Sequence, residues 1–175
     1  MKKILLLILL IKLSIFSVFS QNIEVNLKSF YGIWNNEFIE YYYGGGGIEL
    51  LYEHPLKKGS LRSGIEFRSI NWGNQVALNI GYKLPYVSKE TWSVNGIMTT
   101  GIGLALFREK PLFIWSQEYT TAFQWLKKKK INLDLGLGIR YTHNPAYIKY
   151  GKINQVLDLP FKLGITINLQ KKNKK

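Results

Sequence analysis

The sequence predicts an all-β fold, an eight-stranded antiparallel up-and-down transmembrane β-barrel with a lumen filled by side chains. Eight segments alternate apolar and polar residues with a period of two, which is the pattern of a strand with one apolar face. The connections between these segments are short, so consecutive strands are expected to pair antiparallel as a meander. No other element is predicted that could cover the sheet, and closing the meander into a barrel removes its exposed edges.

The composition indicates one folded domain. The chain has 175 residues, enough for a single core. Its formal net charge is +13, yet 46% of its residues are hydrophobic and 14% aromatic, too apolar for a disordered basic segment. It has no cysteine, which excludes disulfides and thiolate metal sites, and its two histidines are too few for a multi-histidine metal site. We therefore expect neither a cofactor nor a metal ion.

The first 20 residues are typical of a cleavable secretory signal peptide. Two lysines precede an apolar run over residues 4–11, and small residues follow up to Ser20. The alternative is a transmembrane helix, but Lys12 interrupts a run already shorter than the about 20 apolar residues that a span needs. The sequence therefore predicts a signal peptide over residues 1–20 that is cleaved after Ser20, a barrel over residues 21–169 and a basic tail over residues 170–175.

The eight predicted strands are recognised by their alternating apolar residues. In chain order they cover residues 23–33, 48–52, 61–67, 76–84, 92–106, 113–125, 131–141 and 157–169. The breaks between them contain turn-forming or charged residues and lie at residues 34–36, 54–59, 72–74, 85–90, 108–111, 127–130 and 144–154. The last strand is the clearest, because seven apolar residues from Leu157 to Leu169 alternate with polar or small ones.

The remaining question is which face of the strands points inward. A secreted lipocalin-like barrel would bury the apolar face around a small ligand, whereas an outer-membrane barrel turns that face to lipid. The residues that alternate with the apolar ones, called the polar phase, are rich in glycine and include both acidic and basic side chains. This composition favours a tight lumen closed by ion pairs. The predicted polar network of the lumen is Glu49, Arg62, Glu66, Arg68, Lys83, Asp134, Arg140, Asp158 and Lys162.

The aromatic residues gather toward the ends of the predicted strands. Two such groups are typical of the girdles that lie at the two interfaces of a membrane, whereas ordinary core aromatics have no reason to avoid strand middles. The predicted interfacial aromatic residues are Trp34, Tyr52, Trp72, Trp92, Trp115, Trp125 and Tyr141.

The last strand resembles a known assembly signal. Residues 162–169 have a polar residue and a glycine followed by spaced apolar positions, and this resembles the assembly signal of bacterial outer-membrane barrels. The resemblance implies insertion into the outer membrane of a Gram-negative cell by the barrel assembly machinery. The segment lacks a terminal aromatic residue and continues to Lys175. The Lys, Ile and Asn content is similar to that of exported proteins of Bacteroidetes-type bacteria.

One candidate catalytic residue lies just after the seventh predicted strand. Residues 138–146, with residues 101–107 upstream, resemble the lipid A deacylase family of eight-stranded barrels, in which a lipid-facing His, a Ser two residues later and a downstream acid hydrolyse an acyl ester. His143 matches the base, but Pro145 stands at the serine position. The acid would fall near Leu157, and the adjacent Asp158 is in the lumen phase. His143 is therefore only a weak catalytic candidate.

The predicted function is that of a non-catalytic small outer-membrane barrel with a structural or envelope-complex role. The alternatives are a lipid A acyl-ester hydrolase-like enzyme and a lipocalin-like carrier. The predicted partners are outer-membrane lipids including lipopolysaccharide, the barrel assembly machinery through residues 162–169, and a protein of an envelope complex. Export places the N-terminus in the periplasm, so the lysine-rich turns face the periplasm and anionic lipid, and we expect no nucleic acid partner.

Overall fold

The computed structural model describes residues 22–35, 44–70, 73–106, 111–127, 129–143 and 155–169. Within these ranges the chain forms eight strands. They are β1 (Asn22–Asn35), β2 (Gly44–Leu56), β3 (Gly59–Ile70), β4 (Gly73–Ser88), β5 (Trp92–Leu106), β6 (Pro111–Trp125), β7 (Ile131–His143) and β8 (Gln155–Asn168). In these residues there is no helix of the length and apolar character needed to cross a membrane. The predicted signal peptide and basic tail lie outside the described residues.

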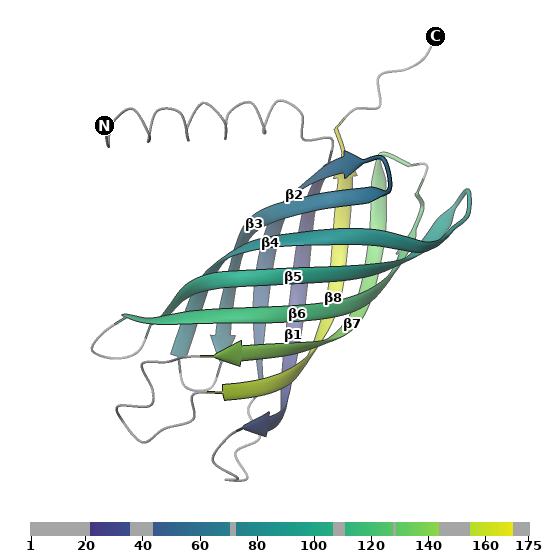
Figure 1. Cartoon of the computed structure of the whole chain (residues 1–175). Coiled ribbons are helices and arrows are strands. Elements are labelled where there is room, and N and C mark those ends of the chain that lie inside the picture. The colour runs from purple at the N-terminus through teal and green to yellow at the C-terminus, as the bar shows by residue number, and fades with distance from the viewer. Residues whose placement is uncertain are drawn as a thin grey trace, which may run out of the picture.

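The eight strands close into one antiparallel barrel in sequence order (Figure 1). Each strand pairs with its neighbours in the chain, and β1 closes the barrel by pairing with β8 from Asn22 opposite Asn168 onward. Closure leaves no strand with an unpaired edge. The prediction of a closed eight-stranded up-and-down barrel is confirmed.

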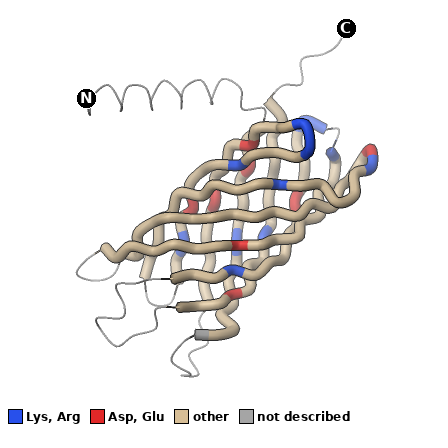
Figure 2. Tube along the Cα trace, viewed as in Figure 1, with Lys and Arg blue, Asp and Glu red and all other residues tan. Residues whose placement is uncertain are grey.

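The two ends of the barrel differ in their connections. β1 begins and β8 ends at one end, which also carries the connections at residues 57–58, 89–91 and 126–130 and is called the turn end below. The other end, called the loop end, receives residues 36–43, 71–72, 107–110 and 144–154, which lie outside the described ranges. Figure 2 shows both charge signs along the strands and basic residues in the turns of the turn end.

Burial alternates along the strands with the polar side inward. Leu163 and Ile165 on β8 are 53% and 45% exposed, whereas Asp134 and Arg140 on β7 are each 1% exposed. A water-soluble protein has the opposite arrangement. The prediction of an outward apolar face and a side-chain-filled lumen is confirmed.

Seven of the eight strands extend beyond their predicted ranges, and two of them continue through prolines. Pro55 and Pro85 were predicted in turns, but they lie in β2 and β4. Pro85 is tolerated because it adjoins a register shift between Pro85 and Val87, where the ladder with β5 is already irregular. The β2–β3 hairpin closes in two residues before Gly59, whose φ of 126° favours glycine.

Candidate functional site in the barrel lumen

The lumen holds most of the charged side chains that the structure describes. Six basic and seven acidic side chains are buried in it, which gives a formal charge of −1. They are Glu24, Lys28, Glu49, Glu53, Arg62, Glu66, Arg68, Lys83, Glu118, Asp134, Arg140, Asp158 and Lys162. Isolated buried charges are unstable, so the partners of each one decide what the lumen can do.

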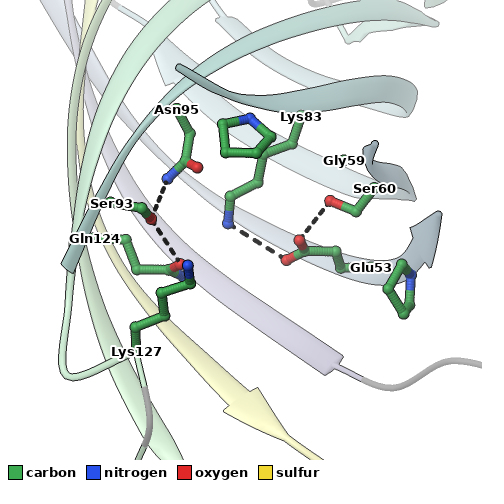
Figure 3. A pocket seen from close by; sticks show the side chains of 10 residues that line it. Glu53, Gly59, Ser60, Lys83, Ser93, Asn95, Gln124 and Lys127 are labelled. Carbon is green, nitrogen blue, oxygen red and sulfur yellow. Dashed lines mark hydrogen bonds and ion pairs between the residues drawn. The ribbon is translucent and has the colours of Figure 1, made fainter. Parts of the chain in front are cut away.

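A cavity of about 200 Å³ occupies the lumen at the turn end (Figure 3). Most of its lining residues have polar side chains, and the full set is Glu53, Pro55, Gly59, Ser60, Lys83, Pro85, Ser93, Asn95, Gln124 and Lys127. Lys83 Nζ lies 3.5 Å from Glu53 Oε2 and 3.9 Å from Asp134 Oδ1, and Ser60 donates a hydrogen bond to Glu53. The cavity is therefore a shallow polar vestibule whose buried cation already has acidic partners.

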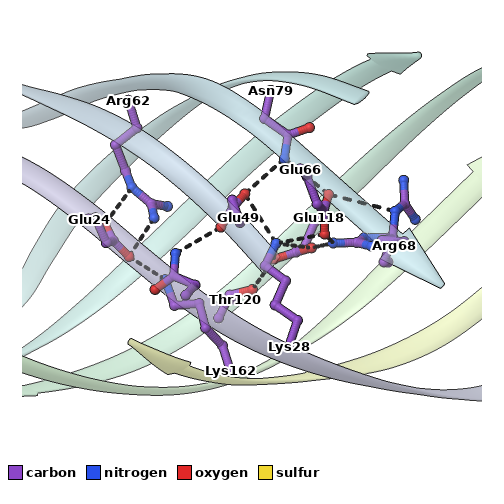
Figure 4. A network of polar contacts seen from close by, with 12 residues as sticks. Glu24, Lys28, Glu49, Arg62, Glu66, Arg68, Asn79, Glu118, Thr120 and Lys162 are labelled. Atoms are coloured by element: carbon purple, nitrogen blue, oxygen red, sulfur yellow. Dashed lines mark hydrogen bonds and ion pairs between the residues drawn. The ribbon is translucent and has the colours of Figure 1, made fainter. Parts of the chain in front are cut away.

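Deeper in the lumen, one carboxylate joins three strands (Figure 4). Glu24 Oε1 on β1 lies 2.7 Å from Arg62 Nη2 on β3 and 2.8 Å from Lys162 Nζ on β8. On the neighbouring strands, Thr166 Oγ1 donates to Asp134 Oδ2 at 2.6 Å. These contacts join the β8–β1 seam, where the two ends of the chain meet, to β3 on one side and to β7 on the other.

At the centre, three carboxylates from three strands converge on one ammonium group (Figure 4). Lys28 Nζ on β1 lies 3.2 Å from Glu49 Oε1 on β2 and 3.3 Å from Glu66 Oε1 on β3. It also lies 3.2 Å from Glu118 Oε2 on β6. A single lysine thus connects β1 to three other strands across the lumen.

Arg140 provides the second positive charge at the centre. Its Nη2 atom lies 2.9 Å from Glu66 Oε1 and also pairs with Glu118. Its guanidinium stacks on the ring of Phe30, with Cζ 4.7 Å from the ring centroid. Gly47 makes room for this group, because a Cβ there would lie 3.2 Å from the Phe30 ring and 3.2 Å from Arg68 Cγ.

Amide side chains complete the network around the central carboxylates. Asn79 Nδ2 donates to Glu49 Oε1 at 2.8 Å and to Glu66 Oε2 at 3.1 Å. Asn26 Nδ2 donates to the other oxygen of Glu49 at 2.8 Å. Because charged groups and their donors fill the middle of the barrel, this part of the lumen is a fixed polar plug. Among the described residues, no cluster of His, Cys, Asp or Glu could hold a metal ion.

All nine residues of the network proposed from the sequence are buried in the lumen. The structure brings eight of them into ion pairs with described partners, and Asp158 lies opposite Arg140 in the β7–β8 register. Sequence reasoning missed Glu24, Lys28, Glu53 and Glu118. The signal was available, because all four lie in the polar phase of strands whose alternation had been identified.

Six of the seven aromatic residues proposed from the sequence lie in the described ranges, on the outer face near the two ends. Trp92 and Trp125 are opposite each other at the turn end, and Tyr52 lies on β2 toward the same end. Trp115 packs edge-on against Tyr141 toward the loop end, with ring centroids 5.5 Å apart. Trp34, near the end of β1, is 42% exposed. Trp72 lies outside the described residues.

His143 is on the outer face of β7 and is separated from Asp158 by the barrel wall. Its ring centroid lies 5.9 Å from that of Trp115, and its Nδ1 atom has no hydrogen-bond partner within the described ranges. Asp158 points into the lumen, so the structure does not bring this histidine and this acid together. Pro145, at the serine position of the family pattern, lies outside the described ranges.

Comparison with known proteins supports the fold. No family model matches the chain, and no curated protein matches it. Among solved structures it is similar to the crystal structure of Neisserial surface protein A (NspA), with a TM-score of 0.59 and 9% sequence identity. The likeness is in the fold. It covers 84% of this chain and 96% of NspA, so nearly the whole of that protein has a counterpart here.

Proposed function

We propose that this chain is a non-catalytic small outer-membrane β-barrel protein of a Gram-negative bacterium, with a structural or surface-interaction role in the cell envelope. The observation that carries the proposal is the inverted burial of the barrel, with apolar side chains outside and ion pairs inside. The barrel fold and the likeness to NspA support the location.

The outer face is too apolar for water. Thirty-four large hydrophobic side chains are exposed on the described part of the chain, and all but Leu126 and Leu169 come from the eight strands. Soluble monomers rarely expose a contiguous apolar patch larger than a few hundred Å². The strands have 12 to 16 residues, which exceeds the roughly 9–11 that a tilted strand needs to cross a bilayer. A barrel of these dimensions fits a lipid environment.

The contents of the lumen disfavour transport and carrier roles. An eight-stranded barrel leaves an interior only wide enough for side chains, and here they form ion pairs across the centre. A lipocalin-like carrier needs an apolar interior for its ligand, whereas this interior is charged. We therefore propose neither a diffusion pore nor a small-molecule carrier.

The geometry also disfavours esterase activity. The lipid A deacylase pattern requires a nucleophile and an acid beside the histidine, but Pro145 has no nucleophilic group and Asp158 is on the opposite side of the wall. We expect overexpression of the protein, and of its His143→Ala variant, to leave the mass of lipid A unchanged. Loss of an acyl chain that depends on His143 would establish the enzyme instead.

The remaining proposals follow from export. The turn end faces the periplasm, and the loop end contacts lipopolysaccharide and any protein partner at the cell surface. Residues 162–169 belong largely to β8, the strand that closes the barrel on β1, and this is a position at which the assembly machinery could engage the chain.

Fractionation tests the proposed location. We expect the protein in the outer-membrane fraction after a urea wash, soluble only in detergent, and migrating faster on a gel before boiling than after it. Recovery of a folded protein in the periplasm without detergent would contradict the proposal.

A further inference from the structure

The charge excess of the chain is concentrated at one end of the barrel. The lumen is nearly neutral, so most of the net +13 lies elsewhere. By sequence, the three connections at the turn end carry seven lysines against a single acid, Glu90. The four segments at the loop end carry four basic and three acidic residues. The barrel is therefore polarised along its axis.

Five of these lysines form a feature that we call the basic collar. Its members are Lys57, Lys58, Lys89, Lys129 and Lys130, and all five are exposed. They occupy all three turns of this end, between β2 and β3, β4 and β5, and β6 and β7 (Figure 2). Because the strand order is closed, these turns are spaced around the rim instead of forming one patch. The fourth position on the rim is where β8 ends, before a tail with four more lysines in its sequence.

Hydrogen bonds fix the turns that carry the collar. Tyr82 donates its hydroxyl to the carbonyl of Lys58, and the Lys127 N–H donates to the Thr91 carbonyl at 3.1 Å. Asn168 on β8 donates its backbone N–H to the Lys130 carbonyl at 2.9 Å and its side-chain amide to the Lys129 carbonyl at 2.6 Å. The backbone positions from which the lysine side chains extend are thus set before any ligand arrives.

Apolar and aromatic side chains lie directly below the collar on the outer face. Trp92 begins β5 just after the turn that carries Lys89, and Trp125 ends β6 just before the turn that carries Lys129 and Lys130. Leu126, within that last turn, is 46% exposed. Cations above aromatic and apolar side chains match the layering of headgroups over acyl chains.

We propose that the basic collar binds the phosphate headgroups of anionic phospholipids in the leaflet that meets the turn end. The proposal rests on the membrane residence proposed above. A ring of cations around the rim is complementary to a bilayer surface that surrounds the barrel, whereas a protein partner would contact only one side of it. Each lysine near such a surface favours an anionic lipid by about fivefold.

Quenching of tryptophan by brominated lipids measures this preference. In the full chain with Trp34, Trp72 and Trp115 changed to Phe, the remaining Trp92 and Trp125 report on lipid next to the collar. This protein is reconstituted in two equimolar mixtures of phosphatidylglycerol and phosphatidylcholine, with bromine on the first lipid in one mixture and on the second in the other. Membrane charge is then identical, so a difference in quenching reports selective contact.

We expect phosphatidylglycerol to be preferred about fivefold at low salt. The preference should fall toward one at about 1 M salt, where the Debye length is about 3 Å. It should also fall in a K89Q/K129Q/K130Q variant whose folding is verified by gel migration. A matched reporter that keeps only Trp115, near the loop end, should show little preference.

The outcomes separate this proposal from the one it rests on. Equal quenching by the two lipids, or an equal preference at Trp115, would overturn the collar while leaving the membrane barrel intact. A preference that survives high salt would also overturn it. No quenching by either lipid would contradict membrane residence itself. The salt series needs no collar variant, so the collar is tested even if the triple variant fails to fold.

Discussion

Lys28 on β1 and Glu118 on β6 are 90 residues apart in the chain, and their charged groups meet at the centre of the lumen with Nζ 3.2 Å from Oε2. The same ammonium group also pairs with Glu49 and Glu66. Three carboxylates in a space closed to solvent repel one another unless a cation stands between them, so the central cluster depends on this lysine.

Replacing Lys28 by Met should therefore destabilise the barrel strongly. Glu66 and Glu118 keep Arg140, but Glu49 keeps only amide donors among its described hydrogen-bond and ion-pair partners. Breaking a buried pair in this way costs about 3–5 kcal/mol of unfolding free energy. The measurement is the urea midpoint of gel-resolved unfolding in lipid vesicles. The double variant K28M/E49Q should recover part of the loss, and an unchanged midpoint in K28M would show that the cluster is not structural.

A pair of adjacent glycines tests the packing around Phe30. A Cβ on Gly47 would lie 2.6 Å from the Phe67 carbonyl oxygen and press on Phe30, whereas a Cβ on Gly46 would meet nothing closer than 3.6 Å. We expect Gly47→Ala to lower the unfolding free energy by about 1–3 kcal/mol through overpacking. Gly46→Ala is the matched control and should have little effect. Equal effects of the two substitutions would contradict the close packing.

On the outer face, Tyr86 lies across Gly96 and its hydroxyl is hydrogen-bonded to that of Tyr119. This contact joins β4 to β6 over the intervening β5. Gly96→Val should displace the Tyr86 ring and cost about 1–3 kcal/mol, and Tyr86→Phe should cost about 0.5–1.5 kcal/mol. In a double-mutant cycle measured by the same urea titration, the two losses should not add. Additive losses would mean that the two sites are independent.

The filled lumen predicts an absence of conductance. Arg140, Lys28 and their carboxylate partners cross the middle of the barrel, so no open aqueous path is expected through the described residues. Planar-bilayer recordings of the purified protein should show no steady ionic current. Large, long-lived openings in the wild type would show that the plug moves.

The alternation along single strands explains why the fold could be predicted. Period two is a local property, and it assigned Leu163 to the outer face and Asp134 to the lumen without knowledge of any partner. Strand ends were less predictable, since Pro55 and Pro85 are usually turn residues and here continue strands.

The pairing inside the lumen could not be predicted from the sequence. Alternation gives the face of a side chain but not its height in the barrel, and height depends on the register of strands that are far apart in the chain. Lys28 and Glu118 meet because the registers of the seven consecutive strand pairs and of the closing β1–β8 pair place these two residues at the same height along the barrel axis. The alternation was sufficient to identify Glu24 and Lys28 as lumen residues, but it could not identify their ion-pair partners.

Spin-label accessibility along β5 tests the inverted barrel most directly. The chain has no cysteine, so single cysteines can be labelled at Ile97, Met98, Thr99, Thr100 and Ile102, none of which is charged. Met98, Thr100 and Ile102 face outward, whereas Ile97 and Thr99 face the lumen. In lipid vesicles, collisions with dissolved oxygen should be high at the three outward positions and low at the other two. Maxima at Ile97 and Thr99, or no alternation, would contradict the account.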